Sequence, residues 1–312
     1  MHLKRHIPIF FAFLLVLTSC EKTIEIDYPE FKPNLVISST PSPDLSWRVN
    51  VSYSKNVLES LNTQYEGNAT VIIKNVYTLE RIHLKYEGEG DYVLYNAFPK
   101  PGHTYELNVH VDDYPMVKAT TYIPKTIDAE VTAAQTLTYE GKKAIRVDFE
   151  IKDNDESRNF YIYEILSLDS YLPDPGNLKE FINSPIKNWL STIDGNTGYI
   201  VDNVGKQSKL FVTDDSFKGA VLNTSLVSYV EQDRKLPNPP DQYPELPEPD
   251  LAKSKLKLSS VSRDMFLYSK SRELILLKNT VNSSLSTPQE PYSNIENGLG
   301  LFAGFNNAIY DL

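Results

Sequence analysis

Residues with the types and spacing needed for catalysis or metal binding are scarce in this 312-residue chain. After the first twenty residues the histidines are His83, His103 and His110, which do not have the spacing of zinc ligands, and the single cysteine, Cys20, has no second thiolate to act with. The sequence contains no nucleophile elbow, Walker loop or dinucleotide-binding glycine pattern. We therefore expect no metal, no cofactor and no catalytic residue.

Carboxylates leave two chemical possibilities open. One is calcium binding at a predicted turn, but that segment lacks the glycine and the final glutamate of a calcium loop, so we expect a solvated turn. Its acidic residues are Asp148, Glu150, Asp153, Asp155 and Glu156. The other possibility is hydrolysis, in which Asp214 or Asp215 would face a distant glutamate across a cleft at about 5 to 10 Å.

Aromatic residues in segments without strand alternation are the candidates for contact with a ligand or a partner. Exposed rings can stack on sugars or anchor a peptide, and aromatic residues are enriched at interaction sites. The candidates are Tyr171, Trp189, Tyr199 and Tyr243. The alternative is that each ring covers a small local core, which is a common role of aromatic residues in loops.

The first 19 residues have the three parts of an export signal peptide. Basic residues precede an apolar run, residues 7–17, that is too short to cross a bilayer as a helix. The sequence Leu17-Thr18-Ser19-Cys20 resembles the lipobox of bacterial lipoproteins, in which the cysteine sulfur receives a diacylglyceryl group. We expect lipidation of Cys20, attachment of the protein to a membrane, and an extended tether over residues 20–33.

Composition narrows the classes of partner. The chain is 41% hydrophobic and 23% charged, as is typical of globular proteins. Its net charge is −10, and removal of a signal peptide would also remove Lys4 and Arg5, so we do not expect binding to nucleic acid. Because Cys20 is the only cysteine, the folded part must be stable without a disulfide.

Residues 34–124 are expected to form an antiparallel β-sandwich of immunoglobulin-like type. Trp47, Val49 and Val51 alternate with polar residues, a period of two that fits a half-buried strand. Similar segments, separated by turn-forming residues, complete a set of short strands. The segments are 35–38, 47–53, 70–74, 82–86, 92–95, 105–111 and 117–123.

Residues 125–312 are expected to form a larger β-rich domain, which gives a mainly β fold class for the whole chain. Residues 145–151 alternate in hydrophobicity and residues 160–166 are rich in aromatic residues, so the two segments are predicted to form a hairpin. A Pro-rich loop is predicted at residues 237–250, because prolines are too frequent there for a helix or a central strand.

One packed helix is predicted in this domain, at residues 262–279. Ser262 is the predicted N-cap, and Asp264 suits the positive end of the helix dipole. The apolar side that would pack on a sheet contains Met265, Tyr268, Ile275 and Leu276, and Arg272 interrupts it.

The sequence Pro291-Tyr292-Ser293-Asn294-Ile295-Glu296-Asn297-Gly298-Leu299-Gly300-Leu301-Phe302-Ala303-Gly304 is the most specific family signal. Together with residues 145–163, Phe217-Lys218-Gly219 and the helix near Tyr268, it resembles a Bacteroidetes lipoprotein family catalogued as domain of unknown function 4249. The resemblance implies an envelope lipoprotein, often encoded beside TonB-dependent outer-membrane receptors, and it implies no catalytic residue.

The expected function is that of a non-catalytic accessory or ligand-binding component associated with a TonB-dependent transporter. The protein would be anchored in the outer membrane through Cys20, on its periplasmic or its cell-surface face, with a TonB-dependent receptor and a glycan or peptide as candidate partners. The alternative is a cell-surface hydrolase or binding protein that acts on glycans or peptides.

Overall fold

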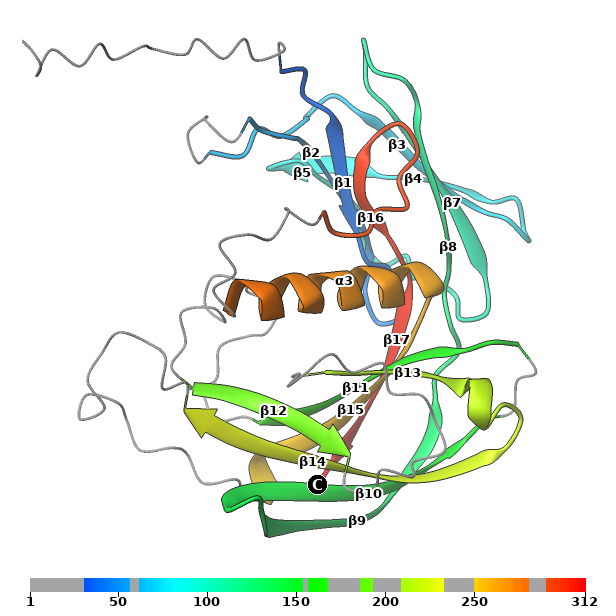
Figure 1. Cartoon of the computed structure of the whole chain (residues 1–312). Helices are drawn as coiled ribbons and strands as arrows, with labels where there is room; N and C mark the ends of the chain where they lie inside the picture. The colour runs from blue at the N-terminus through cyan, green and yellow to red at the C-terminus, as the bar shows by residue number, and fades with distance from the viewer. Residues whose placement is uncertain are drawn as a thin grey trace, which may run out of the picture. The chain divides into compact units, whose positions relative to one another are not determined.

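The computed structural model describes residues 31–56, 62–153, 157–167, 186–192, 209–232, 250–280 and 290–312. In these stretches the chain is mainly β, with several antiparallel sheets and a long helix in the C-terminal region, which confirms the predicted fold class at this level (Figure 1). The predicted signal peptide, Cys20 and residues 237–249 of the Pro-rich loop lie outside the described residues.

Sheets A and B contain the strands of residues 35–122 and one strand from the C-terminal segment. Their strand orders are β16-β1-β2-β6-β5 in sheet A and β4-β3-β7-β8 in sheet B. Sheet A consists of β1 (Leu35–Ser39), β2 (Trp47–Tyr53), β5 (Lys85–Gly88), β6 (Asp91–Leu94) and β16 (Leu299–Phe302). Sheet B consists of β3 (Thr70–Asn75), β4 (Arg81–His83), β7 (Thr104–His110) and β8 (Val117–Tyr122).

The inward faces of sheets A and B share one apolar core. Trp47, Val49 and Val51 of β2 are buried while Arg48 between them is exposed, as the alternation predicts. The ring of Trp47 packs edge-on against that of Tyr105 in β7, with 4.8 Å between their centroids. Large side chains therefore hold the two sheets together without a disulfide.

The strand predicted at residues 82–86 is divided between the two sheets. Its first part is β4, which pairs with β3 in sheet B, and its second part is β5, which pairs with β6 in sheet A. Leu84 lies between the two parts and is buried in the shared core. Because the chain crosses between sheets without losing its alternation, the sequence pattern does not reveal the division.

Sheets C and D form the remainder, with strand orders β12-β14-β10-β9 and β13-β11-β15-β17. Sheet C consists of β9 (Asp128–Tyr139), β10 (Lys142–Lys152), β12 (Ile186–Thr192) and β14 (Val221–Gln232). Sheet D consists of β11 (Phe160–Ser167), β13 (Leu210–Thr213), β15 (Ser254–Val261) and β17 (Phe305–Asp311). A second apolar core lies between them, where the rings of Phe149 and Tyr163 meet edge to face at 5.7 Å.

The hairpin predicted from residues 145–151 and 160–166 is wrong, because the two segments lie in different sheets. β10 pairs with β9 and β14, whereas β11 pairs with β13 and β15. The tight turn at Glu140 and Gly141 has positive φ at both residues, 48° and 77°, which suits a two-residue hairpin loop. This turn joins β9 to β10, so the less regular segment before it supplies the partner strand.

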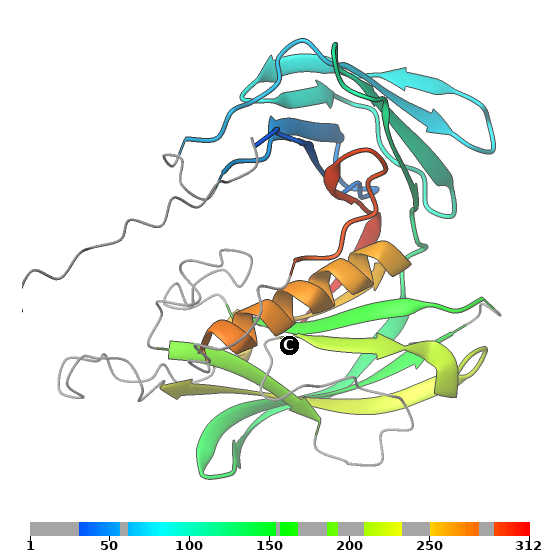
Figure 2. The ribbon, with the colours of Figure 1, turned by 45° about the horizontal axis from the view of Figure 1, so that its top comes forward.

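Helix α3 (Arg263–Thr280) begins where the sequence predicts it. The Ser262 hydroxyl accepts a hydrogen bond from the Met265 amide at 3.2 Å and caps the first turn. Figures 1 and 2 show the helix along one face of sheet D. Sheet D is therefore covered on both faces, which accounts for the nearly continuous apolar run of β11.

The residues that attach the helix to sheet D differ in part from the predicted apolar side. Phe266, which the prediction omitted, is buried, and its ring lies 5.7 Å from that of Phe211 in β13. Arg272 lies over the ring of Tyr268, 5.7 Å from its centroid, so this arginine extends the aromatic contact instead of breaking it. Phe266, in the first turn, is therefore an anchor of the helix on sheet D.

The C-terminal segment contributes one strand to sheet A and the next strand to sheet D. β16 runs parallel to β1, with Ser39 opposite Phe302, and β17 runs antiparallel to β15. Between them the Gly304 amide donates a hydrogen bond to the Thr121 hydroxyl at 2.7 Å. The side chain of Asn306 donates to the Pro124 carbonyl at 3.1 Å. The segment therefore bonds to the chain on both sides of residue 123.

Gly300 is required where β16 passes β1. Its φ is +112°, and a Cβ atom at this position would lie 1.9 Å from the Ile37 carbonyl oxygen. Gly88 has almost the same φ, +113°, but a Cβ atom there would have no neighbour within 4 Å. The two glycines thus share a positive φ that residues with a side chain rarely adopt. Of the two, only Gly300 has a neighbouring backbone atom where a Cβ atom would lie.

We expect Gly300→Ala to lower the free energy of unfolding by about 2 to 4 kcal/mol, because β16 must move away from β1. Gly88→Ala is the matched control, with an expected loss of about 1 kcal/mol from backbone conformation alone. Urea denaturation followed by circular dichroism measures both values. Equal losses in the two variants would contradict the close approach at Gly300.

Candidate functional site

A groove of about 360 Å³ lies on the outward side of sheet A. Its floor comes from β1, β2 and β6, because every second residue of these strands points away from the core. The loop between β1 and β2 and the end of β6 provide its walls. Its principal lining residues are Ser38, Thr40, Leu45, Arg48, Asn50 and Tyr95.

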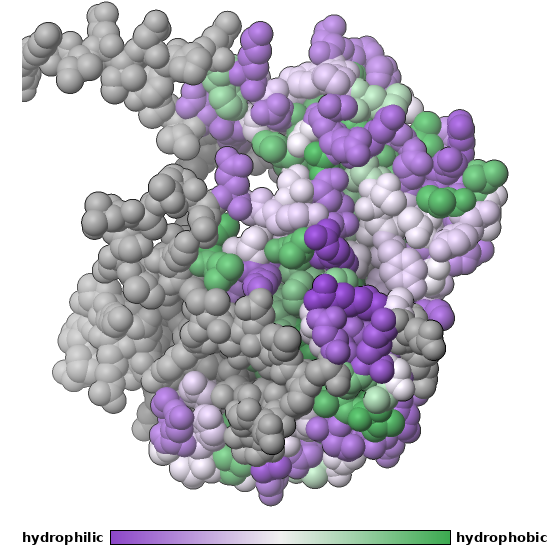
Figure 3. Space-filling view, turned by 45° about the vertical axis from the view of Figure 1, so that its right-hand side comes forward, coloured by the Kyte–Doolittle hydropathy of each residue, from purple (hydrophilic) through white to green (hydrophobic). Residues whose placement is uncertain are grey.

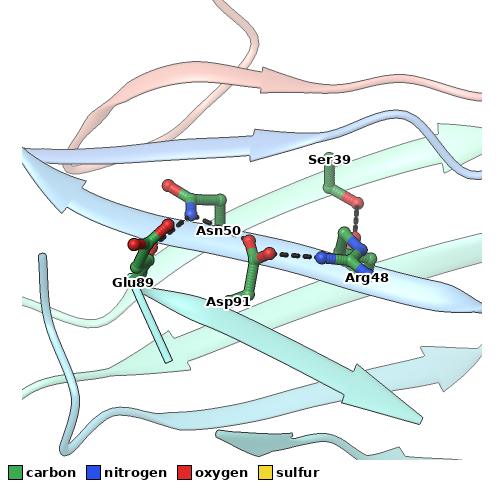
Figure 4. A network of polar contacts seen from close by, with 5 residues as sticks. All are labelled: Ser39, Arg48, Asn50, Glu89 and Asp91. Carbon is green, nitrogen blue, oxygen red and sulfur yellow. Dashed lines mark hydrogen bonds and ion pairs between the residues drawn. The ribbon is translucent and has the colours of Figure 1, made fainter. Parts of the chain in front are cut away.

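Asp91 of β6 organises the polar floor of this groove (Figure 4). One carboxylate oxygen forms an ion pair with Arg48, and the other accepts a hydrogen bond from the Asn50 amide at 2.9 Å. The same Asn50 nitrogen donates to the Glu89 carbonyl at 2.9 Å, and the Ser39 hydroxyl donates to the Arg48 carbonyl at 2.7 Å. Arg48 and Asn50 are thus held in place by neighbours within the sheet.

The groove combines neutral polar groups with apolar side chains at its wall. The Arg48 charge is balanced by Asp91, and the Asn50 carbonyl oxygen accepts no hydrogen bond from the described residues. The side chains of Leu45 and Tyr95 are 51% and 57% exposed. The described residues that line the groove include no histidine or cysteine, and they offer hydroxyl, amide and guanidinium groups together with apolar side chains.

A second cavity, of about 250 Å³, lies beside residues 122–128 and the ends of β10 and β11. Lys125, Lys152, Asp153, Asn159 and Tyr161 are among its lining residues. Asp153 is itself 6% exposed and accepts a hydrogen bond from the Gly219 amide at 3.2 Å. Behind Asp153 lies a second carboxyl group, that of Asp214.

Asp214 is fully buried, and one of its carboxylate oxygens has no hydrogen-bond donor among the described residues. The other oxygen accepts hydrogen bonds from the backbone and side-chain nitrogens of Asn159, at 2.9 and 3.1 Å. Burial raises the pKa of Asp214, the Asn159 hydrogen bonds oppose this, and the neighbouring Asp153 carboxylate raises it further.

Asp215 has the opposite environment although it is the next residue. Its carboxylate accepts hydrogen bonds from the Thr213 hydroxyl at 2.8 Å and from Arg158 at 2.5 Å. These two donors lower the pKa of Asp215, and the side chain is 40% exposed. Among the described residues, the carboxyl group that acts on Asp214 is that of Asp153, and the pairing of Asp214 or Asp215 with a distant glutamate across a cleft stays a prediction.

The aromatic residues predicted to contact a ligand or partner lie mainly outside the described residues, as Tyr171, Tyr199 and Tyr243 do. The backbone of Trp189 lies in β12, opposite Tyr229 of β14. Asp155 and Glu156 of the predicted acidic turn also lie outside the described part of the chain. Where the structure is described, no group of three or more His, Cys, Asp or Glu side chains is arranged to hold a metal ion.

The groove was not identified from the sequence. In the sequence, Arg48 and Asn50 can be recognised only as residues on the polar side of a predicted strand. Asp91 lies far from them along the chain, between the strands predicted at residues 82–86 and 92–95. The register that sets Asn50 opposite Asp91 brings these residues together, and this register depends on strand pairing that the pattern does not specify.

The chain is thus a mainly β protein with a groove formed by side chains on the outward face of a sheet. Residues 21–310 match the family described as a domain of unknown function, DUF4249, and the chain belongs to this family. No curated protein matches the chain. Within the described residues, the structure has no helix of the length and hydrophobicity that would cross a membrane.

The raised pKa of Asp214 predicts a specific pH dependence of stability. A protonated Asp214 stabilises the fold below the pKa of about 4 of an unfolded aspartate, and this contribution is lost as the pH rises through the higher folded-state value. Asp214→Asn keeps a neutral group of similar shape. We therefore expect this variant to become increasingly more stable than the wild type between about pH 4 and pH 7, as measured by urea denaturation.

Asp215→Asn is the control with the opposite sign. Because the folded-state pKa of Asp215 is lowered, its carboxylate stabilises the fold above the unfolded value and loses this effect as the pH falls. That variant should be less stable than the wild type near neutral pH, and the difference should vanish in acid. A parallel response of the two variants would contradict the different environments of these aspartates.

Proposed function

We propose that this protein is a non-catalytic lipoprotein of the outer membrane that binds a ligand and associates with a TonB-dependent transporter. The groove on sheet A is the observation that carries this proposal, because its lining residues provide hydrogen-bonding groups and apolar side chains to a ligand. The signal-like N-terminus, Cys20 and the Bacteroidetes setting implied by the resemblance support the location and the class of partner.

We also infer that sheets A and B form an immunoglobulin-like sandwich. The orders β1-β2-β6-β5 and β4-β3-β7-β8 correspond to the strand orders A-B-E-D and C′-C-F-G of that fold, which supports the inference. The proposed first domain covers residues 34–124 together with β16, and the second covers the rest of the chain after residue 124.

Association with a large protein partner would need a surface outside the groove. On the coloured part of the face shown in Figure 3, hydrophobic residues occur in small groups between hydrophilic ones. Such a surface resembles that of an ordinary soluble protein more than an obligate interface. We therefore propose the Pro-rich loop at residues 237–250, which includes Tyr243, as the element that docks on the receptor.

Lipidation of Cys20 should determine membrane attachment. We expect Cys20→Ala to move most of the protein from the carbonate-washed outer-membrane fraction to the soluble fraction, because two or more acyl chains are needed for stable anchoring. Ser19→Ala, which keeps a small residue before the cysteine, should remain in the membrane fraction. Retention of both variants after the wash would contradict anchoring through Cys20.

Co-purification tests the proposed partner directly. The full lipidated chain is isolated with mild detergent from its native outer membrane, and bound proteins are identified by mass spectrometry. A TonB-dependent receptor is expected with the wild type and is expected to be lost when residues 238–250 are deleted. Absence of any such receptor would contradict the association, and retention after the deletion would contradict docking through the loop.

A surface hydrolase is the second candidate function, and one observation favours it. Asp153 and Asp214 form a buried carboxyl pair next to a cavity, and carboxyl pairs of this kind can act as acid and base. Turnover of a glycan or peptide by the wild type, lost in Asp214→Asn but kept in Asp215→Asn, would favour hydrolysis over the binding function.

A further inference from the structure

We propose that the groove on sheet A binds a neutral saccharide, which specifies the ligand of the proposed binding function and rests on that function. The proposal depends on the charge balance of the groove, its fixed hydrogen-bonding groups and the ring exposed at its wall. Each of these features is set by the described residues.

The charge of the groove favours a neutral ligand. Arg48 is its cationic lining residue, and Asp91 already neutralises it. An anionic ligand would have to compete with Asp91 for the guanidinium, and a cationic ligand would meet the guanidinium itself. A ligand that hydrogen-bonds without carrying charge leaves this ion pair intact.

The polar groups of the floor are fixed before any ligand arrives. Asp91 and the Glu89 carbonyl use the amide hydrogens of Asn50, so its carbonyl oxygen remains available to accept a hydrogen bond. The hydroxyls of Ser38 and Thr40 also line the groove and form no hydrogen bond with other described residues. Because the Asn50 amide is already held by its two acceptors, it loses little conformational entropy on binding, which suits recognition of a sugar hydroxyl.

The apolar part of the groove suits the other face of a sugar. A pyranose ring carries hydroxyls around its edge and C–H groups on its faces, and an aromatic ring can pack on such a face. Tyr95 is 57% exposed and Leu45 is 51% exposed, both at the wall of the groove. The volume of about 360 Å³ is at the lower end of the range for small-molecule sites, enough for a short saccharide segment.

An extended peptide is a poorer fit to the same groove. Peptides commonly bind to sheets by adding a strand at an open edge. The floor strands β1 and β2 each have a paired neighbour on both sides, β16 and β2 for β1, and β1 and β6 for β2. Their backbone groups are therefore used within the sheet, and only side chains are left for recognition.

The test uses the full lipidated chain in detergent and isothermal titration calorimetry. Maltotetraose, cellotetraose and mannotetraose are the neutral probes, tetragalacturonate is the acidic probe and tetra-alanine is the peptide probe. We expect at least one neutral tetrasaccharide to bind with a Kd of about 1 mM or lower and the acidic and peptide probes to bind at least about tenfold more weakly.

Two variants and a matched control locate the binding. Tyr95→Ala and Asn50→Ala should each weaken binding of that neutral tetrasaccharide by about tenfold or more. Tyr77→Ala removes an equally exposed ring, 65% exposed, that lies beside His103 and outside the groove, and it should change the Kd by less than about twofold. Urea denaturation of each variant confirms that the fold is retained.

Asp91 is proposed as a positioning residue, and Asp91→Asn tests the role of charge balance. Releasing Arg48 from its partner should strengthen binding of tetragalacturonate while it weakens binding of the neutral tetrasaccharide. A purely structural role for Asp91 would weaken both. Loss of the fold would weaken binding of both probes, so it cannot produce this opposite response.

Several results would overturn the saccharide proposal. These are failure of all neutral probes to bind, stronger binding of tetragalacturonate or tetra-alanine by the wild type, and binding that neither Tyr95→Ala nor Asn50→Ala weakens. Co-purification of a TonB-dependent receptor together with any of these results would leave the proposed accessory function standing and reject only the ligand. Saccharide binding without co-purification of a receptor would reject the association with a transporter and leave the ligand proposal standing.

Discussion

The parallel pairing of β16 with β1 is the constraint on which the rest of the structure depends. It changes β1 from an edge strand into an interior strand, so the groove floor has a paired strand on each side of β1. It also fixes the start of β17, because Phe302 and Phe305 are separated by only two residues. Gly300 permits the pairing by allowing the backbone to approach Ile37 without a Cβ atom.

Buried charge is handled in two different ways in the second pair of sheets. Glu164 is 7% exposed and lies between Lys209 at 3.0 Å and Lys257 at 2.9 Å. Burial alone would raise the pKa of Glu164, but the two ammonium groups lower it, so the carboxylate stays charged. Asp214 has no such cation among the described residues, and burial raises its pKa instead. The same fold thus contains one carboxylate stabilised as an anion and one favoured in its neutral form.

Strands and the helix were predictable because each depends on local pattern and capping. The alternation around Val49 and the hydroxyl of Ser262 gave the correct element type and nearly the correct bounds. Pairing was less predictable, because the aromatic run of β11 carries no information on which of its neighbours it joins. The tight turn at Glu140 and Gly141 instead gives β10 its partner β9, and the φ angles of this turn are not visible in the composition of the flanking segments.

The groove residues illustrate the same limit for function. Strand register is what brings Arg48, Asn50 and Asp91 together, so their spacing in the sequence does not identify them as a site. Tyr171 departs from strand alternation in the sequence, whereas Tyr95 continues the alternation of a strand and carries no such signal, although it lines the groove. Local sequence patterns identify the strands and the helix, whereas the site depends on the register in which the strands pair.

The position of β16 delays completion of the first sheet while the chain is being made. Synthesis from the N-terminus presents β1 early, but its parallel neighbour β16 follows only after sheet C, helix α3 and three of the four strands of sheet D. One edge of β1 remains open during that interval, and pairing across such a sequence separation is slow. The first sheet is therefore completed late, and a chaperone that shields a single strand edge would have the most to protect in this part of the molecule.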